Sequence, residues 1–312
     1  MDLESKFLGG MLGSALGDCI GELAFDYKDE ASLIQIVKEI PLLVYTDDTA
    51  MAIGLAESLL STQGRLDLEH LGTTFKRNFR HEPFRGYASG PPSIFSTVDQ
   101  TGASYVEIAQ NLFGGTGSFG NGAAMRITPL GLFFFDSPDL YEEAKRSAIV
   151  THAHPLGIDG AALLAKAISL MVLKDPEDKE KIAESNDFWD TIQNFVQTKE
   201  FGQKIHQMKE LLSQDVLREF AASKLGTNVT SLGSVPFSIF SFLKNPYSFE
   251  TCLLETVLIR GDRDTIGAMV GGLLGSYLGV EAIPMKWLKK LENRHYIEEL
   301  AKKLFELKER LL

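Results

Sequence analysis

Apolar residues recur at intervals of three and four along most of this chain, and the strict alternation typical of half-buried strands is scarce. This spacing predicts an all-α fold. Helices are expected over residues 48–61, 67–78, 103–112, 138–150, 157–173, 204–222 and 247–259. A buried, glycine-rich helix is expected over 264–278. The similar small-residue segment 9–21 is its expected packing partner, which would bring both ends of the chain into one core.

Polar and charged residues dominate two other stretches. Residues 174–213 are expected to form solvated helices at the periphery, and residues 284–312 a pair of amphipathic helices. No linker rich in Pro, Gly or Ser divides the sequence, and it holds no repeat or low-complexity tract. A single compact domain over residues 1–312 is therefore predicted.

Composition narrows the classes of partner. The net charge of −11 is unfavourable for a nucleic-acid groove, so an anionic ligand would need local help from metal ions or backbone N–H groups. Cys19 and Cys252 are the only cysteines, too few for a disulfide framework or a thiolate zinc site. The N-terminus lacks a basic leader before an apolar segment, and no apolar run has the length of a membrane span. A cytoplasmic protein without a membrane partner is expected.

Two short motifs place acidic and hydroxyl side chains at the start of predicted helices: Thr46-Asp47-Asp48-Thr49 and Asp262-Arg263-Asp264-Thr265. Thr and Asp are common helix caps, so capping alone is one explanation. One cap needs only one such residue, however, and adjacent carboxylates repel each other. Carboxylate and hydroxyl oxygens are the ligands that Mg²⁺ and Mn²⁺ prefer. Together the motifs predict the two halves of an oxygen-ligand metal site.

A glycine-rich loop at residues 114–126 leads into a helical pattern. It has neither the Gly-Lys-Ser/Thr ending of a Walker loop nor the strand context of a Rossmann turn. Successive N–H groups at a helix start bind phosphate, and a tight turn packed on the core is the alternative explanation. His152 is expected to be a hydrogen-bonding wall of the pocket or a structural histidine. No Ser-His-Asp or Cys-His nucleophile pattern is present.

Seven motifs, taken in order, resemble those of the ADP-ribosylglycohydrolase family. They are LGDCIG at 16–21, YTDDTAMA at 45–52, RGYASG at 85–90, GSFGNGAAMR at 117–126, THAHPLGIDGA at 151–161, SVPFSIFSFL at 234–243 and GDRDTIGAMVGGLLGSYLG at 261–279. The family includes dinitrogenase-reductase-activating glycohydrolases and ADP-ribosyl-acceptor hydrolases. The motifs at 117–126 and 234–243 look closest to the branch that removes ADP-ribose from serine and cleaves poly(ADP-ribose) or O-acetyl-ADP-ribose.

The resemblance implies one domain of orthogonal helices with a central metal-binding cleft. It also implies metal-dependent hydrolysis of the glycosidic bond that links ADP-ribose to a protein side chain, another ADP-ribose or an acetyl group. Two Mg²⁺ ions, or Mn²⁺, would be bound by Thr46, Asp47, Asp48, Asp262, Asp264 and Thr265. The diphosphate and adjoining ribose would lie against Gly117, Ser118, Phe119, Gly120, Asn121 and Gly122, with His152 lining the site. ADP-ribosylated proteins or ADP-ribose derivatives are the implied partners.

Two positions depart from the family pattern. Relatives usually carry a functional Glu where this chain has Phe25. The catalytic carboxylate is therefore expected to be Glu22 or Asp26, which are otherwise solvated loop acids, or Asp47. Arg263 stands where relatives carry Thr or Ser. It is expected either to turn away or pair with an acid or phosphate, or to replace one of the two cations.

Three classes of function remain open at this point. The first is the hydrolase, with Asp18 expected to cap or orient backbone near the site rather than to bind metal. The second is a catalytically silent ADP-ribose-binding module, which Phe25 favours. The third is a structural protein that has kept the fold. Linkage preference, protein targets and oligomeric state do not follow from the sequence.

Overall fold

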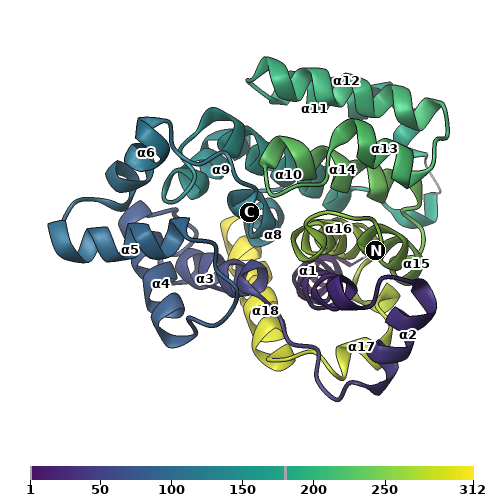
Figure 1. Ribbon diagram of the computed structural model, residues 1–312, viewed down its shortest axis with the longest axis horizontal. Coiled ribbons are helices and arrows are strands. Elements are labelled where there is room, and N and C mark those ends of the chain that lie inside the picture. Colours follow the sequence, from purple (N-terminus) through teal and green to yellow (C-terminus); the bar gives the residue numbers. More distant parts are fainter. Residues whose placement is uncertain (1, 179–180) are drawn as a thin grey trace.

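The computed structural model describes residues 2–178 and 181–312, which form an assembly of α-helices (Figure 1). In chain order these are α1 Leu3–Asp26, α2 Glu30–Glu39, α3 Asp47–Ser61, α4 Leu68–His81, α5 Gly90–Thr101, α6 Tyr105–Gly115, α7 Gly122–Met125, α8 Thr128–Phe133, α9 Leu140–Ile149, α10 Pro155–Leu173, α11 Asn186–Phe195, α12 Lys199–Ser213, α13 Arg218–Leu225, α14 Ser231–Lys244, α15 Phe249–Val257, α16 Arg263–Leu278, α17 Met285–Leu288 and α18 Arg294–Leu311. Over the described ranges no strand forms, and only two isolated bridges occur, Leu43 with Leu291 and Gly120 with Thr230. The predicted all-α class is confirmed.

Helices α1 and α16 lie side by side at the centre of the molecule (Figure 1). Their facing glycines recur every four residues and so occupy one face of each helix: Gly9, Gly13, Gly17 and Gly21 on α1, and Gly267, Gly271 and Gly275 on α16. A Cβ on Gly17 would lie 2.5 Å from the carbonyl carbon of Gly267 and closer still to its oxygen. The two backbones are therefore in direct contact, and the predicted pairing of segments 9–21 and 264–278 is confirmed.

Helix α10 is a second central element, packed against α8, α9, α14 and α16. Judged by length and composition only, this helix is long and apolar enough to cross a membrane. Most of that apolar stretch is buried among neighbouring helices of this protein. It therefore serves as a core helix, and Pro155 at its first position begins it without losing a helical hydrogen bond.

The connection from α2 to α3 is held against the turn before α18. Leu43 donates its N–H to the Lys290 carbonyl over 2.7 Å, and Glu292 donates its N–H to the Leu43 carbonyl over 3.0 Å. Because these bonds fix the approach to α3, they set where its first turn points. Helices α11 and α12, by contrast, lie at the periphery, as predicted for residues 174–213 (Figure 1). Residues 179 and 180 of that stretch lie outside the described residues.

The prediction of one helix over residues 204–222 is wrong. Helix α12 ends at Ser213 and α13 begins at Arg218, with Asp215 in the left-handed region at φ 50°. The Val216 N–H then returns to the Leu211 carbonyl and closes the turn. An aspartate tolerates this conformation better than most residues, so the chain breaks the helix without glycine or proline.

We expect Gly17→Ala to lower the free energy of unfolding by about 3 kcal/mol, because the new methyl group must push α1 away from α16. Gly202→Ala in α12 is the matched control. A Cβ there meets only the end of the flexible Gln193 side chain at 2.9 Å, so the change should be neutral or stabilise by up to about 1 kcal/mol. Denaturant unfolding measures both. Equal stability of Gly17→Ala and the unchanged protein would contradict the direct backbone contact.

Candidate functional site

Five aspartates from three helices meet at the centre of the structure. This acid cluster consists of Asp18 from α1, Asp47 and Asp48 from the first turn of α3, Asp262 before α16, and Asp264 in its first turn. Each carboxylate lies close enough to others of the cluster for their charges to act on one another. The glycine contact between α1 and α16 and the placement of α3 therefore bring the two acidic motifs together, as the sequence predicts.

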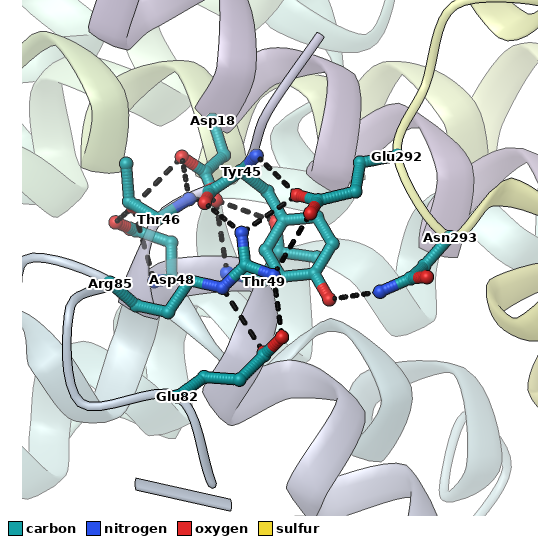
Figure 2. A network of polar contacts seen from close by, with 9 residues as sticks. All are labelled: Asp18, Tyr45, Thr46, Asp48, Thr49, Glu82, Arg85, Glu292 and Asn293. Carbon is teal, nitrogen blue, oxygen red and sulfur yellow. Dashed lines mark hydrogen bonds and ion pairs between the residues drawn. The ribbon is translucent and has the colours of Figure 1, made fainter. Parts of the chain in front are cut away.

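Asp18 holds the start of α3. Its carboxylate accepts hydrogen bonds from the backbone N–H of Thr46 at 3.0 Å and of Thr49 at 3.1 Å. It also accepts from both threonine hydroxyls, at 2.8 and 2.6 Å (Figure 2). Asp18 is fully buried and so caps α3 from a different helix. Its expected role of orienting backbone near the site is confirmed.

Capping does not account for the other acidic side chains. Because Asp18 already accepts from the first turn of α3, Asp47 and Asp48 are not needed there. Asp262 occupies the N-cap position of α16 but makes no capping hydrogen bond. Its Oδ2 instead accepts from the Asn121 side-chain amide at 2.6 Å. The acids of both motifs are thus available for another purpose.

The acid cluster is short of positive charge. Asp48 is 1% exposed, and its Oδ1 has no hydrogen-bond partner, while its Oδ2 shares the single hydroxyl hydrogen of Thr46 with Asp18. The buried Oδ1 of Asp264 also lacks a partner. Burial first, and then neighbouring aspartates, raise the pKa of Asp47, Asp48 and Asp264 above the usual range. Partnerless buried carboxylate oxygens are costly, so a cation is the natural complement.

The donor atoms suit a hard divalent cation, since they are carboxylate and threonine hydroxyl oxygens. Within residues 2–178 and 181–312, no three His, Cys, Asp or Glu side chains are already arranged as ligands of one ion. Among the candidate ligands, Asp262 is directed to Asn121 by a hydrogen bond.

A cavity of about 470 Å³ opens above the acid cluster, a size typical of small-molecule sites. The predicted site residues that line it are Asp47, Ser118, Phe119, Gly120, Asn121, Gly122, His152, Asp262, Asp264 and Thr265. Lining residues that the sequence did not single out include Met51, Gly86, Phe113, Met125, Thr151, Val229 and Thr230. Gly117 does not line it. With φ +73° and no room for a Cβ beside the His154 backbone, Gly117 forms the tight turn that was the alternative explanation of the loop.

Asn121 joins the glycine loop to the acid cluster. Its side-chain amide donates to Asp262 and, at 3.1 Å, to the hydroxyl of Ser234. The Ser234 hydroxyl donates its own hydrogen to the Thr230 carbonyl. It can therefore only accept from Asn121, which directs the NH₂ group of the amide toward Ser234. In the preceding turn, the backbone N–H groups of Ser118 and Phe119 donate to no acceptor among the described residues. The loop therefore offers free N–H donors beside the carboxylates.

His152 is held as a neutral hydrogen-bond donor. Arg126, fully buried, donates to the Thr151 hydroxyl oxygen at 2.8 Å, and that hydroxyl lies 2.8 Å from His152 Nδ1. The Thr151 oxygen could accept a second hydrogen bond, but its hydroxyl hydrogen has no other acceptor than Nδ1 among the described residues, which favours a ring with its hydrogen on Nε2. Nε2 faces Gly120 and Gly122 at the cavity wall. Burial, helped by the charge of Arg126, lowers the pKa of His152 to about 3.

Comparison with known proteins decides the family. The ADP-ribosylglycohydrolase family profile matches residues 1–311. The chain belongs to the ADP-ribosylglycohydrolase family. It is 31% identical over 339 residues to ADP-ribosylhydrolase ARH3 of Homo sapiens, covering 96% of this chain and 93% of that protein. It is likewise 31% identical over 337 residues to the ARH3 of Xenopus tropicalis, covering 97% and 95%.

A solved structure supports the fold assignment. The chain titled "ADP-ribosylglycohydrolase-related protein complex" superposes with a TM-score of 0.72 over 98% of this chain and 99% of that chain, at 22% identity. At this identity the likeness establishes the ADP-ribosylglycohydrolase fold. Together with the profile and the ARH3 relatives, it assigns the chain to a family of hydrolases that act on bonds to ADP-ribose.

In this ADP-ribosylglycohydrolase the arginine between the two aspartates turns away from the acid cluster. The Arg263 guanidinium donates to the carbonyls of Ile259 at 3.1 Å and Leu258 at 3.3 Å, and to that of Ala24. Leu258 and Ile259 directly follow the C-terminal end of α15 and Ala24 lies in the last turn of α1, where a cation is favourable. Arg263 therefore ties two helix ends together and does not replace a cation in the cluster.

Helix α1 continues through Asp26, so the candidate carboxylates after Asp18 are helical rather than loop acids. Residues 18, 22 and 25 share one face of this helix. Glu22 lines a second cavity together with Asp47 and Asp264, and partial burial and the charge of Asp26 raise its pKa. Asp26 lines neither cavity. Of the two acids that flank Phe25, the structure brings Glu22 to the acid cluster.

This second cavity has a volume of about 450 Å³. It shares Asp47, Gly86 and Asp264 with the first cavity, so the two cavities adjoin at the acid cluster. Its lining is Cys19, Glu22, Leu23, Ile40, Val44, Tyr45, Thr46, Asp47, Phe84, Arg85, Gly86 and Asp264. Thr46 thus faces this cavity, whereas Asp48 lies buried behind both.

We expect the neutral His152 ring to carry its hydrogen on Nε2, because Thr151 donates to Nδ1. Long-range ¹⁵N–¹H correlation spectra of the ring distinguish the two tautomers, with His152→Gln used to assign the signals. Thr151→Ser keeps the hydroxyl and should keep this tautomer, whereas Thr151→Val should give a mixture. A hydrogen on Nδ1 in the unchanged protein would contradict the assignment.

Proposed function

We propose that this protein is a Mg²⁺-dependent hydrolase that cleaves the glycosidic bond between ADP-ribose and an acceptor. The observation that carries the proposal is the pair of partnerless, buried carboxylate oxygens in the acid cluster, that of Asp264, which lines both cavities, and that of Asp48, which lines neither. A junction of two cavities suits a reaction in which the bond to be broken lies between two parts of one substrate. The family supports the same reaction class.

The acid cluster would hold the cation. Its proposed ligands are the two Thr and four Asp side chains of the acidic motifs, Thr46, Asp47, Asp48, Asp262, Asp264 and Thr265. A bound dication would supply Lewis-acid polarisation, a template for the ribose hydroxyls and activation of water. Asp18 keeps α3 in register, and Asn121 holds Asp262, so the ligand-bearing turns are positioned in advance.

The first cavity would bind the ADP-ribose part. Its glycine loop presents the free N–H groups of Ser118 and Phe119, which suit the diphosphate oxygens. His152, which also lines this cavity, would offer its neutral Nε2–H group as a donor to a substrate oxygen. These donors compensate for the negative charge of the protein as a whole.

Glu22 is the proposed proton donor. Hydrolysis breaks the bond from the anomeric carbon to the acceptor heteroatom, joins that carbon to a water oxygen and returns a proton to the leaving group. Glu22 lies on the second cavity beside Asp47 and Asp264, and its raised pKa favours a carboxyl that can give up a proton there. Phe25 shares its helix face but has no titratable group, so Glu22 would take the role associated with that position.

Release of ADP-ribose from a serine-linked ADP-ribosyl peptide and from O-acetyl-ADP-ribose, with Mg²⁺ and with EDTA, tests the proposal. Asp47→Asn and Asp264→Asn should each lower kcat/KM by about 100-fold or more, because each removes a charge from the cation site. Asp190→Asn, at an exposed position on α11, is the matched control and should retain activity. Release that is unaffected by EDTA would contradict the metal dependence.

Glu22→Gln, assayed alongside, should lower kcat by about 10²–10⁴-fold with little change in KM, because it removes the proton donor but not the binding surfaces. Calorimetric titration with ADP-ribose completes the set. Binding of ADP-ribose without release from any substrate would reject the enzyme and establish the silent binding module instead.

A further inference from the structure

The second cavity differs in chemistry from the first. Its apolar surface comes from Leu23, Ile40, Val44 and Phe84, and the last two are 49% and 75% exposed. Its acidic residues are Glu22, Asp47 and Asp264, and the last two are proposed ligands of the cation, so Glu22 is the one acid of the lining left free. Whatever occupies this cavity therefore meets apolar side chains and the Glu22 carboxyl group rather than the free N–H donors of the glycine loop.

Arg85 is the one cation among the described lining residues, and it has no donor left for a ligand. Its five N–H groups make five hydrogen bonds: to both oxygens of Glu82 at 2.9 and 3.1 Å, to both oxygens of Glu292 at 2.7 and 3.1 Å, and to the Tyr45 carbonyl at 3.0 Å. Figure 2 shows the guanidinium enclosed by these groups. Five donors are all that an arginine has.

The charge of Arg85 is also more than neutralised. Glu82 and Glu292 together carry one more unit of negative charge than the guanidinium offsets. Tyr45 stacks against the guanidinium with 4.0 Å between its centre and the ring centroid, which leaves that face covered. An anionic group in the second cavity would find no uncommitted positive side chain among the described residues, and it would lie near the surplus negative charge of Glu82 and Glu292.

We propose that the second cavity is the acceptor subsite and that it takes a neutral or basic peptide segment of a mono-ADP-ribosylated protein, not a further ADP-ribose unit. This inference rests on the proposed function, which places the ADP-ribose in the first cavity. The bond to be cleaved then lies at the acid cluster, and the leaving group extends into the second cavity. In a poly(ADP-ribose) chain that leaving group carries a diphosphate, for which this cavity has no free cationic side chain and which the surplus negative charge around Arg85 disfavours.

Phe84 provides the principal apolar contact for such a peptide. It is the most exposed large apolar side chain of the lining and stands next to Arg85, over which its ring lies at 5.5 Å. Aromatic side chains, Phe among them, are enriched where proteins contact their partners. Because Phe84 is largely solvated and outside the buried core, it can be changed without removing core packing.

The test compares kcat/KM with Mg²⁺ for four substrates that share the ADP-ribose part. They are O-acetyl-ADP-ribose, whose leaving group is too small to fill the second cavity, poly(ADP-ribose), and two serine-linked ADP-ribosyl peptides with basic or glutamate-rich flanks. We expect the basic peptide to exceed the acidic peptide and the internal bonds of poly(ADP-ribose) by about tenfold or more. Internal poly(ADP-ribose) bonds cleaved as efficiently as the basic peptide would overturn the proposal.

Phe84→Ser provides the second measurement. The ratio of kcat/KM for the basic peptide to that for O-acetyl-ADP-ribose should fall by about fivefold or more, through KM rather than kcat. Phe220→Ser, at a 49% exposed position on α13 that lines neither cavity, is the matched control and should leave the ratio unchanged. An unchanged ratio in Phe84→Ser would also overturn the proposal.

Different results would reject the acceptor subsite and the proposed hydrolase. Turnover of O-acetyl-ADP-ribose with the wrong order among the larger substrates would reject the acceptor subsite and leave the proposed hydrolase intact. No turnover of any of the four substrates would reject the proposed function, and the acceptor subsite with it.

Discussion

The direct backbone contact between α1 and α16 is the constraint on which the rest of the structure depends. Glycine at every fourth position of both helices lets the helices approach more closely than any side chain would allow. That approach places Asp18 beside the first turn of α16, and Asp18 in turn caps α3. The packing of this one helix pair thus brings together two acidic motifs that are distant in sequence.

The same arrangement buries several carboxylates together, and the side chains around them do not neutralise this negative charge. Three buried arginines lie near the acid cluster, yet Arg85 is enclosed by glutamates, Arg126 supports Thr151, and Arg263 binds helix ends. The charge of Arg126 lowers the pKa of Asp47, but this effect is smaller than those of burial and of the neighbouring aspartates, which raise it. The proposed cation would neutralise the negative charge of the cluster. Without it, the buried carboxylates lower the stability of the fold, so their retention suits a role in a reaction.

Features that repeat locally in the sequence were predictable, whereas those formed by distant partners were not. The pairing of α1 with α16 follows from small residues at regular spacing, and the role of Asp18 from its place among them. The break before α13 was missed because Asp215 adopts a left-handed conformation where the sequence has no glycine or proline. The enclosure of Arg85 by residues 82 and 292 depends on tertiary contact, as does the position of Glu22, rather than Asp26, at the second cavity, which required the orientation of α1.

The acid cluster built by this helix pair is proposed to be a cation site. The most direct measurement is anomalous X-ray diffraction from crystals grown with Mn²⁺, which locates the ion without reference to activity. An anomalous peak is expected between the turn that carries Asp47 and Asp48 and the turn that carries Asp262 and Asp264. A fully loaded crystal with no peak there, or with its peaks only at surface carboxylates, would contradict the proposed cation site.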